Sequence, residues 1–274
     1  MKSNMTHLPS EPSFSGFKEK CICCEHTGKL MNKEHFFPQW LLKGTSCEKT
    51  LFSSPYGKIP GRKLTIPLCE DCNSKLGSNL EAPVSKIFEN IERGMGFNDN
   101  DAELLVRWMW KIKGMFYWSI CNDNWLYSSL TLKERVLEKI GSPRSRISIG
   151  ISVIEDELEN EEFGYAPIGL SSFTFWSNVY VVGVFSKLSI VVFYSIYRPL
   201  INENIWTVYT LSDYPILMNP KKKVFPITYF ENGTIAVKTT RLFLGQNSRL
   251  EKLHELTALD MRSSIGVRDS DGGD

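Results

Sequence analysis

Four cysteines near the amino terminus have the spacing of metal ligands. They form two Cys-x-x-Cys pairs, Cys21/Cys24 and Cys69/Cys72. One tight turn in each pair can aim two sulfurs at one ion, so together the pairs satisfy a closed tetrahedral Zn²⁺ site. Such a structural site requires nothing further. A Glu34-His35 dipeptide between the pairs, and Asn73 directly after the last cysteine, therefore indicate chemistry carried on a zinc scaffold.

Glu34, His35 and Asn73 are the residue types that metal-assisted hydrolysis uses. A histidine can act as a general base near neutral pH, because its unperturbed pKa is about 6.5. The carboxylate of Glu34 and the amide oxygen of Asn73 are hard donors that suit Mg²⁺ or Mn²⁺. Phosphodiester hydrolysis needs an activated water and a cation that neutralises charge on the phosphoryl oxygens. This set of residues supplies both.

The order of these residues resembles the HNH endonuclease family. The segments that carry the resemblance are Cys21-x-x-Cys24, then Lys33-Glu34-His35-Phe36-Phe37-Pro38, then Leu68-Cys69-Glu70-Asp71-Cys72-Asn73-Ser74-Lys75. The likeness covers about residues 20–82. It implies a ββα-metal fold, in which a β-hairpin and a following helix clasp one metal.

The resemblance also implies roles for individual residues. His35 would be the general base, Glu34 the acidic metal ligand and Asn73 the final HNH position. The four cysteines would hold a structural Zn²⁺, and a separate Mg²⁺ or Mn²⁺ would serve catalysis. Glu81 could add a polar contact to the site. The expected activity is metal-dependent hydrolysis of DNA phosphodiester bonds, as an effector in restriction or anti-phage (antiviral) defence.

One departure from the family keeps other interpretations open. Many members carry a middle Asn that orients the histidine, and residues 63–67 contain none. The first alternative is therefore a non-catalytic zinc module that binds DNA or a protein partner. A second is that the C-terminal sheet is the functional centre and the zinc segment only scaffolding. Asn73 could instead cap the helix that it opens, and His26 could replace a cysteine on zinc.

Charge indicates that any contact with DNA is local. The formal net charge of the 274 residues is only +1, but residues 1–80 hold eleven Lys/Arg against seven Asp/Glu, 11 − 7 = +4. We expect Arg62 and Lys63 to be the principal phosphate contacts. The further candidates are Lys33, Lys75, Lys43 and Lys58.

The pattern along the chain predicts an α+β protein in which the zinc-stapled HNH domain precedes helices and an antiparallel β-sheet domain. The expected units are a flexible leader at 1–17, the zinc-bound domain at 18–82, a helical segment at 83–145, a β-rich domain at 146–262 and a disordered tail at 263–274. We expect the β-rich domain to sense, recruit a partner protein or mediate self-association.

Apolar residues recur at helical spacing and then change to the period of strands. The expected helices are 73–80, 83–93 with a stop at Gly94, 99–120, 131–140 and 250–259. The expected strands are 147–154, 172–176, 179–185, 188–196, 206–211 and 235–244, with a hairpin turn at 231–233. Large aromatics such as Trp108 are expected to fill the core rather than stack on bases.

The remaining composition predicts a cytoplasmic protein that does not enter a membrane. The polar residues 1–17 lack the apolar core of a signal peptide. Four of the seven cysteines fall into metal-like pairs and leave an odd remainder of three, which does not suggest an oxidised framework. The apolar stretch 179–196 is interrupted by polar residues, so we interpret it as two buried strands that meet at Ser186-Lys187.

Overall fold

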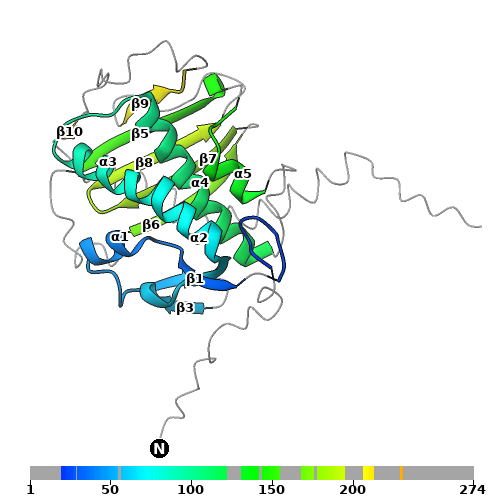
Figure 1. Ribbon diagram of the computed structural model, residues 1–274. Helices are drawn as coiled ribbons and strands as arrows, with labels where there is room; N and C mark the ends of the chain where they lie inside the picture. Colours follow the sequence, from blue (N-terminus) through cyan, green and yellow to red (C-terminus); the bar gives the residue numbers. More distant parts are fainter. Residues whose placement is uncertain are drawn as a thin grey trace, which may run out of the picture.

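The computed structural model has an α+β fold, in which helices lie over one face of a mainly antiparallel sheet and the cysteine-rich segment packs at one end (Figure 1). The structure describes residues 20–28, 30–54, 57–121, 131–141, 144–154, 168–175, 178–194, 206–212 and 229–230. The expected leader, the tail and the elements predicted at 231–233, 235–244 and 250–259 lie outside these residues.

The cysteine-rich segment is built on a pair of antiparallel strands that leads directly into a helix. Its elements are β1 (Met31–His35), α1 (Gln39–Gly44), β2 (Leu51–Ser54), β3 (Gly57–Pro60), η1 (Gly61–Lys63), β4 (Thr65–Cys69) and α2 (Glu70–Leu76). Strand β1 pairs with β4, so that Met31 lies opposite Cys69 and His35 opposite Thr65. The β2–β3 hairpin is an insertion between these two strands.

The helix after the last cysteine is longer than expected and begins earlier. Helix α2 continues through a π-helical segment, η2 (Gly77–Glu81), into α3 (Ala82–Glu92). Cys69 is the N-cap residue, so the prediction that a helix opens at Asn73 is wrong. Acidic side chains in the first turn, Glu70 and Asp71, favour the observed start. Helix α3 confirms the prediction for 83–93, and Gly94 follows it with φ 72°.

Two further helices agree with the sequence in position, although one is shorter. Helix α4 (Asp99–Cys121) confirms the long predicted helix, and Trp108 on it is fully buried, with its ring against Phe88 and Phe185. Helix α5 (Leu132–Leu137) starts at a capping box on Thr131. It ends before the predicted residue 140, because Glu138 is already extended.

The sheet carries most of the second half of the described chain. Its strands are β5 (Ile147–Ile154), β6 (Ile168–Phe175), β7 (Asn178–Phe185), β8 (Leu188–Tyr194), β9 (Thr207–Thr210) and β10 (Tyr229–Phe230). The order is β10-β5-β8-β7-β6, and β9 also pairs with β5. All pairs are antiparallel except β10 with β5. The β7–β8 turn at Ser186-Lys187 confirms the prediction, whereas β6 begins earlier than expected.

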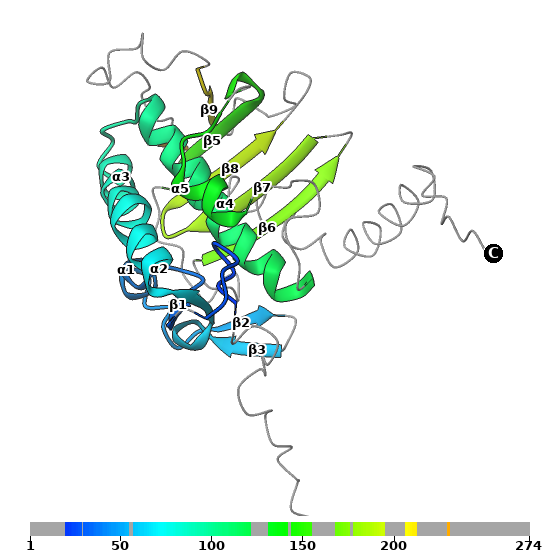
Figure 2. The same cartoon turned by 45° about the vertical axis from the view of Figure 1, so that its right-hand side comes forward.

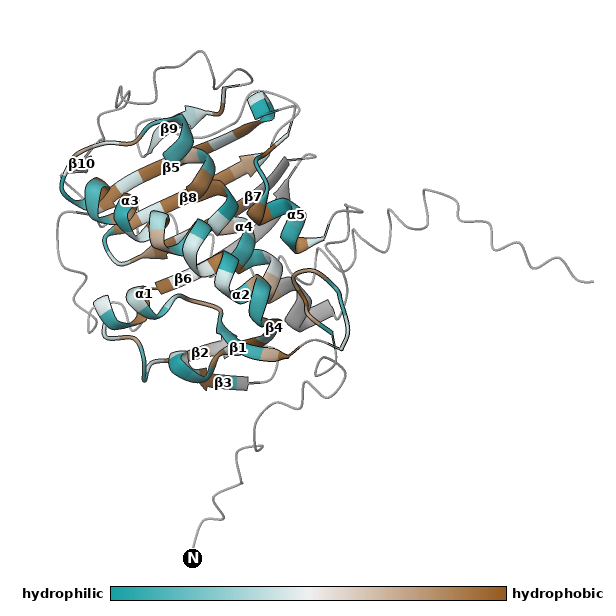
Figure 3. Ribbon diagram, viewed as in Figure 1, coloured by the Kyte–Doolittle hydropathy of each residue, from teal (hydrophilic) through white to brown (hydrophobic). Residues whose placement is uncertain are grey.

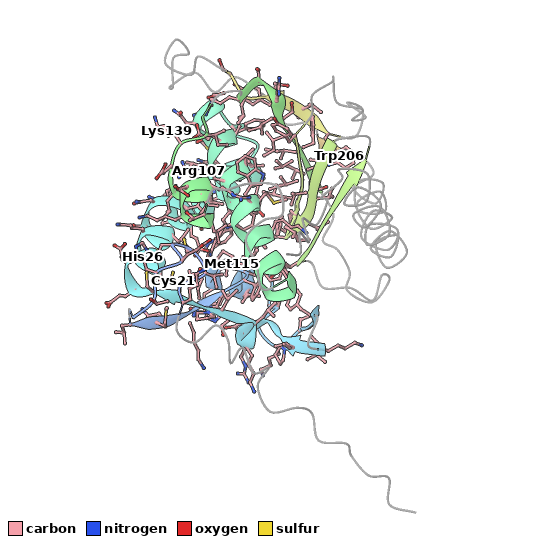
Figure 4. All side chains as sticks on the ribbon, turned by 90° about the vertical axis from the view of Figure 1, so that its right-hand side faces the viewer. Cys21, His26, Arg107, Met115, Lys139 and Trp206 are labelled. Carbon is pink, nitrogen blue, oxygen red and sulfur yellow. The ribbon has the colours of Figure 1, made fainter. Side chains whose placement is uncertain are left out.

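One hydrophobic core joins the cysteine-rich segment, the helices and the sheet. Helices α3 and α4 cover one face of the sheet (Figure 2), and the strands beneath them are predominantly apolar (Figure 3). Trp206 belongs to a smaller cluster with Val182, Val191 and Phe193, on the side of the sheet away from Met115 of α4 (Figure 4). Within the described residues, no helix is both long enough and apolar enough to span a bilayer.

Candidate active site and metal centre

The structure gathers the four predicted zinc ligands into one buried cluster. The Sγ atoms of Cys21, Cys24, Cys69 and Cys72 all lie within 4.8 Å of one another. The Cys24 and Cys69 sulfurs are 3.8 Å apart. A tetrahedral ion with Zn–S bonds of about 2.3 Å separates its sulfurs by about 3.8 Å. The cluster therefore has the dimensions of a zinc site and could bind this ion.

The first pair of cysteines is shaped by a tight backbone turn. The Glu25 N–H donates to the Cys21 carbonyl at 2.7 Å, and Glu25 has a left-handed φ of 62°. The Cys21 N–H donates to the His26 carbonyl at 3.0 Å. Nδ1 of His26 lies 2.9 Å from the carbonyl oxygen of Cys24, and His26 is not part of the four-cysteine group. The structure therefore does not support His26 as a replacement ligand.

The second pair of cysteines is placed by the junction between β4 and α2. Cys69 ends the strand and occupies the N-cap position of the helix, and its N–H donates to Cys21 Sγ at 3.3 Å. Burial raises the pKa of the Cys21 thiol to about 12. Zinc binds cysteine as the thiolate, so metal binding at this cluster is coupled to the release of protons. None of these four cysteines forms a disulfide.

Glu34 lies on the inner face of β1, where it meets a buried lysine. The Lys111 side chain of α4 is 0% exposed. Its Nζ donates to Oε1 of Glu34 and to Oε1 of Glu81, the last residue of η2. Glu34 itself is buried, at 8% exposure. We call these three residues the Glu34–Lys111–Glu81 triad. It joins β1, α4 and the π-helical segment.

The electrostatics of the triad are those of a compensated buried charge. Burial alone would lower the pKa of Lys111, but the carboxylates of Glu81 and Glu34 outweigh it and the pKa is raised. Burial raises the pKa of Glu81, and the nearby Glu34 acts in the same direction. Two carboxylates and one ammonium give the triad a formal charge of −1 when all three are ionised.

His35 is at the end of β1 and has a different environment. Successive side chains of a strand point to opposite faces, so His35 lies on the face away from Glu34. It is half-buried, shares its face with the exposed Lys33, and lies directly opposite Thr65 of β4. Cross-strand pairs of this kind have Cβ atoms about 5 Å apart, so the side chains of His35 and Thr65 are neighbours on that face.

Asn73 lies inside α2 rather than at its start. Its carbonyl accepts from the Gly77 N–H, and the N-cap position belongs to Cys69. The alternative that Asn73 caps this helix is therefore wrong. The side chain is half-buried. The Glu34 carboxylate accepts a hydrogen bond from Lys111, which also donates to Glu81.

The basic residues predicted to contact phosphate are on the surface. Arg62 and Lys63 form most of η1, and both are exposed. Lys75 is exposed but already pairs with Asp71 one turn earlier, at 2.9 Å. Such exposed pairs are weak and exchange readily with other anions. The other exposed candidates are Lys33, Lys43 and Lys58.

Sequence reasoning did not identify Lys111. A signal was present, because Leu104, Trp108, Lys111 and Met115 follow the helical spacing of one face. Trp108 and Met115 are fully buried, so a lysine between them must be buried too. A buried ammonium requires carboxylate partners. The sequence did not show which carboxylates pair with Lys111, since Glu34 is 77 residues away.

Comparisons of the chain with protein-family models, with curated proteins and with solved structures find no match.

Proposed function

We propose that this chain is a metal-dependent HNH endonuclease that hydrolyses DNA phosphodiester bonds. One observation carries the proposal. Two antiparallel strands, the first bearing Glu34-His35, lead at Cys69 straight into a helix, and the four-cysteine cluster lies at that junction. This is the order strand, strand, helix that the motif residues imply for a ββα-metal site.

In this proposal, His35 removes the proton from the attacking water. Its half-buried position on the outer face of β1 leaves the ring within reach of a large substrate. A thiolate cluster suits Zn²⁺, and carboxylate and amide oxygens suit Mg²⁺ or Mn²⁺, so the two sites should select different metals. The net negative triad supports a cation at Glu34, with Asn73 as the further expected ligand. The bound Mg²⁺ would neutralise charge on the phosphate.

Charge on the cysteine-rich segment supports DNA as the substrate. Residues 31–64 contain six Lys/Arg and two Glu, 6 − 2 = +4. One of the two acids, Glu34, is already paired with Lys111. The uncompensated charge includes Arg62 and Lys63, which are exposed on η1. We expect these residues to contact the phosphate backbone, which makes binding sensitive to salt.

The second half of the chain carries no comparable set of reactive side chains in its described strands. We propose that the sheet domain senses a trigger, recruits a partner protein or mediates self-association for the nuclease. An effector of restriction or anti-phage defence acting in the cytoplasm is the biological setting that we favour.

A plasmid cleavage assay tests the proposal. The zinc-loaded full-length chain should nick or linearise supercoiled DNA after Mg²⁺ or Mn²⁺ is added, and not before. Glu34→Ala should remove this response, because it deletes the anionic metal ligand. His26→Ala is a histidine control near the zinc cluster but off β1, and should cleave at close to the wild-type rate. Cleavage that is independent of added metal, or equal in Glu34→Ala, would contradict the proposal.

A second candidate function is a non-catalytic zinc module that binds DNA or a protein. The specific observation in its favour is that Glu34, the expected metal ligand, is already ion-paired with the Lys111 ammonium. Residues 63–67 also lack the middle Asn. This candidate predicts salt-sensitive DNA binding through Arg62 and Lys63, with no cleavage at any Mg²⁺ concentration. The same plasmid assay, run beside a binding assay, separates the two functions.

A further inference from the structure

A fully buried lysine in this fold requires an explanation. Taking an ammonium out of water is costly unless carboxylates compensate it. An apolar side chain at position 111 would continue the stripe formed by Trp108 and Met115 without that cost. Such a lysine is therefore placed for its charge and its reach.

The triad joins parts of the chain that are far apart in the sequence. Lys111 on α4 meets Glu34 on β1 and Glu81 at the end of η2, which are 77 and 30 residues away. The element that delivers Glu81 is itself unusual. Segments of π-helix are rare and occur frequently at functional sites. Here the segment continues the buried series Cys72, Leu76, Leu80 at a spacing of four residues and sets Glu81 toward α4.

Lys111 could either cancel the charge of Glu34 or orient its carboxylate, and the net charge of the triad distinguishes these two roles. A lysine paired with Glu34 alone would cancel the carboxylate and repel a cation. With Glu81 also ionised, the three groups together carry a net charge of −1, so one negative charge remains beside Lys111. Lys111 can then fix one oxygen of Glu34 while the carboxylate still attracts a metal. Outer partners that orient a metal-binding carboxylate in this way are a general feature of metal sites.

We propose that Lys111 is a positioning residue that orients the Glu34 carboxylate for a divalent cation, with Glu81 as its counter-charge. The inference rests on the proposed function in one respect, that Glu34 is a metal ligand. It adds the residue that holds this ligand in place, on a helix outside the cysteine-rich segment. The same contact ties the metal site to the α4 helix that covers the sheet.

Binding of Mn²⁺ to the zinc-loaded full-length chain tests the proposal without any need for DNA cleavage. Free Mn²⁺ is measured by its electron paramagnetic resonance signal, and zinc content is measured on the same samples. Lys111→Met should weaken Mn²⁺ binding by about 10- to 100-fold, the usual loss for an outer-shell partner. The double variant Lys111→Met/Glu81→Gln restores the net charge of −1, so it should remain equally weak if orientation is what matters.

Two controls distinguish orientation from general damage. Lys86→Met changes an exposed lysine of α3 and should bind Mn²⁺ like the wild type. Arg144→Met removes a different buried cation, one that pairs with Asp99 and Glu103 in the first turns of α4, so it destabilises the fold away from Glu34. If Arg144→Met weakens Mn²⁺ binding as much as Lys111→Met, the effect is structural and the proposal is wrong.

The double variant Lys111→Met/Glu81→Gln shows whether Lys111 orients Glu34 or acts only as a counter-charge. If it binds Mn²⁺ within about threefold of the wild type, Lys111 acts only as a counter-charge and the positioning role is overturned. If Glu34→Ala binds as much Mn²⁺ as the wild type, Glu34 is not a metal ligand. The inference then fails, because it rests on that premise. A wild type that binds Mn²⁺ through Glu34 but cuts no DNA contradicts the proposed nuclease function, while the variants still decide the role of Lys111.

Discussion

Replacement of Arg144 by methionine should destabilise the fold strongly, because this residue is the hub of a buried ion network. Its Nη2 donates to Asp99 Oδ2 at 2.6 Å, and its Nη1 donates to Glu103. Its Nε donates to the Ser212 carbonyl at 2.6 Å. These contacts join η3 (Arg144–Arg146) and the residues after β9 to the first turns of α4. Methionine retains much of the volume but none of the donors.

The loss of stability in Arg144→Met depends on the hydrogen bonds that Asp99 and Glu103 keep. Loss of one partner of a buried pair costs about 3–5 kcal/mol. Asp99 keeps the Tyr209 hydroxyl at 2.7 Å and the Ser212 N–H at 2.9 Å, and Glu103 keeps the Ile140 N–H. We therefore expect the lower part of this range, about 3 kcal/mol. For a chain of this size that corresponds to a fall in Tm of about 6–12 °C.

Thermal and urea unfolding of the zinc-loaded chain measure this loss. Arg93→Met is the matched control, because Arg93 is exposed just after α3, and its change should stay within about 0.5 kcal/mol. The reasoning would be refuted by an Arg144→Met variant whose unfolding midpoint matches that of Arg93→Met.

Three further outcomes are expected. Cys69→Ser should reduce the bound zinc measured by metal analysis to well below one ion per chain, and unchanged zinc would exclude the four-cysteine site. Gly61→Ala should destabilise the fold by about 1–3 kcal/mol in urea unfolding, because its Cβ would lie 2.7 Å from the Cys47 carbonyl oxygen; a neutral effect would contradict this packing. Burial, then the hydrogen bond to Asp99, raises the pKa of Tyr209, so its contribution to stability is complete below about pH 10 and is lost as pH rises further. Urea unfolding of Tyr209→Phe should therefore show a smaller alkaline loss of stability than the wild type, and identical pH profiles would contradict the assignment.

Local pattern was sufficient to predict the two long helices and the central strands of the large sheet. The helices at 82–92 and 99–121 follow from apolar residues at helical spacing, and β7 and β8 follow from continuous apolar runs around Ser186-Lys187. The clustering of the four cysteines follows from their spacing, because two Cys-x-x-Cys pairs are typical of one shared metal site.

Features that depend on distant partners were not predictable in the same way. The start of α2 at Glu70 depends on Cys69 ending a strand that pairs with β1, so Asn73 falls inside the helix. The continuous path from α2 to α3 through a π-helical segment has no simple periodicity in the sequence. The triad required knowledge of which carboxylates Lys111 reaches, and that follows only from the packing of α4.

The rate of DNA cleavage by His35→Ala tests the central claim most directly. The proposed nuclease predicts a rate lower by about 10²- to 10⁴-fold, the usual cost of removing a general base. Zinc content, the unfolding midpoint and salt-dependent DNA binding should remain close to the wild type, because the zinc cluster and the basic residues are untouched. Cleavage at the wild-type rate would contradict the catalytic assignment, and loss of zinc or of folding would make His35 a structural residue.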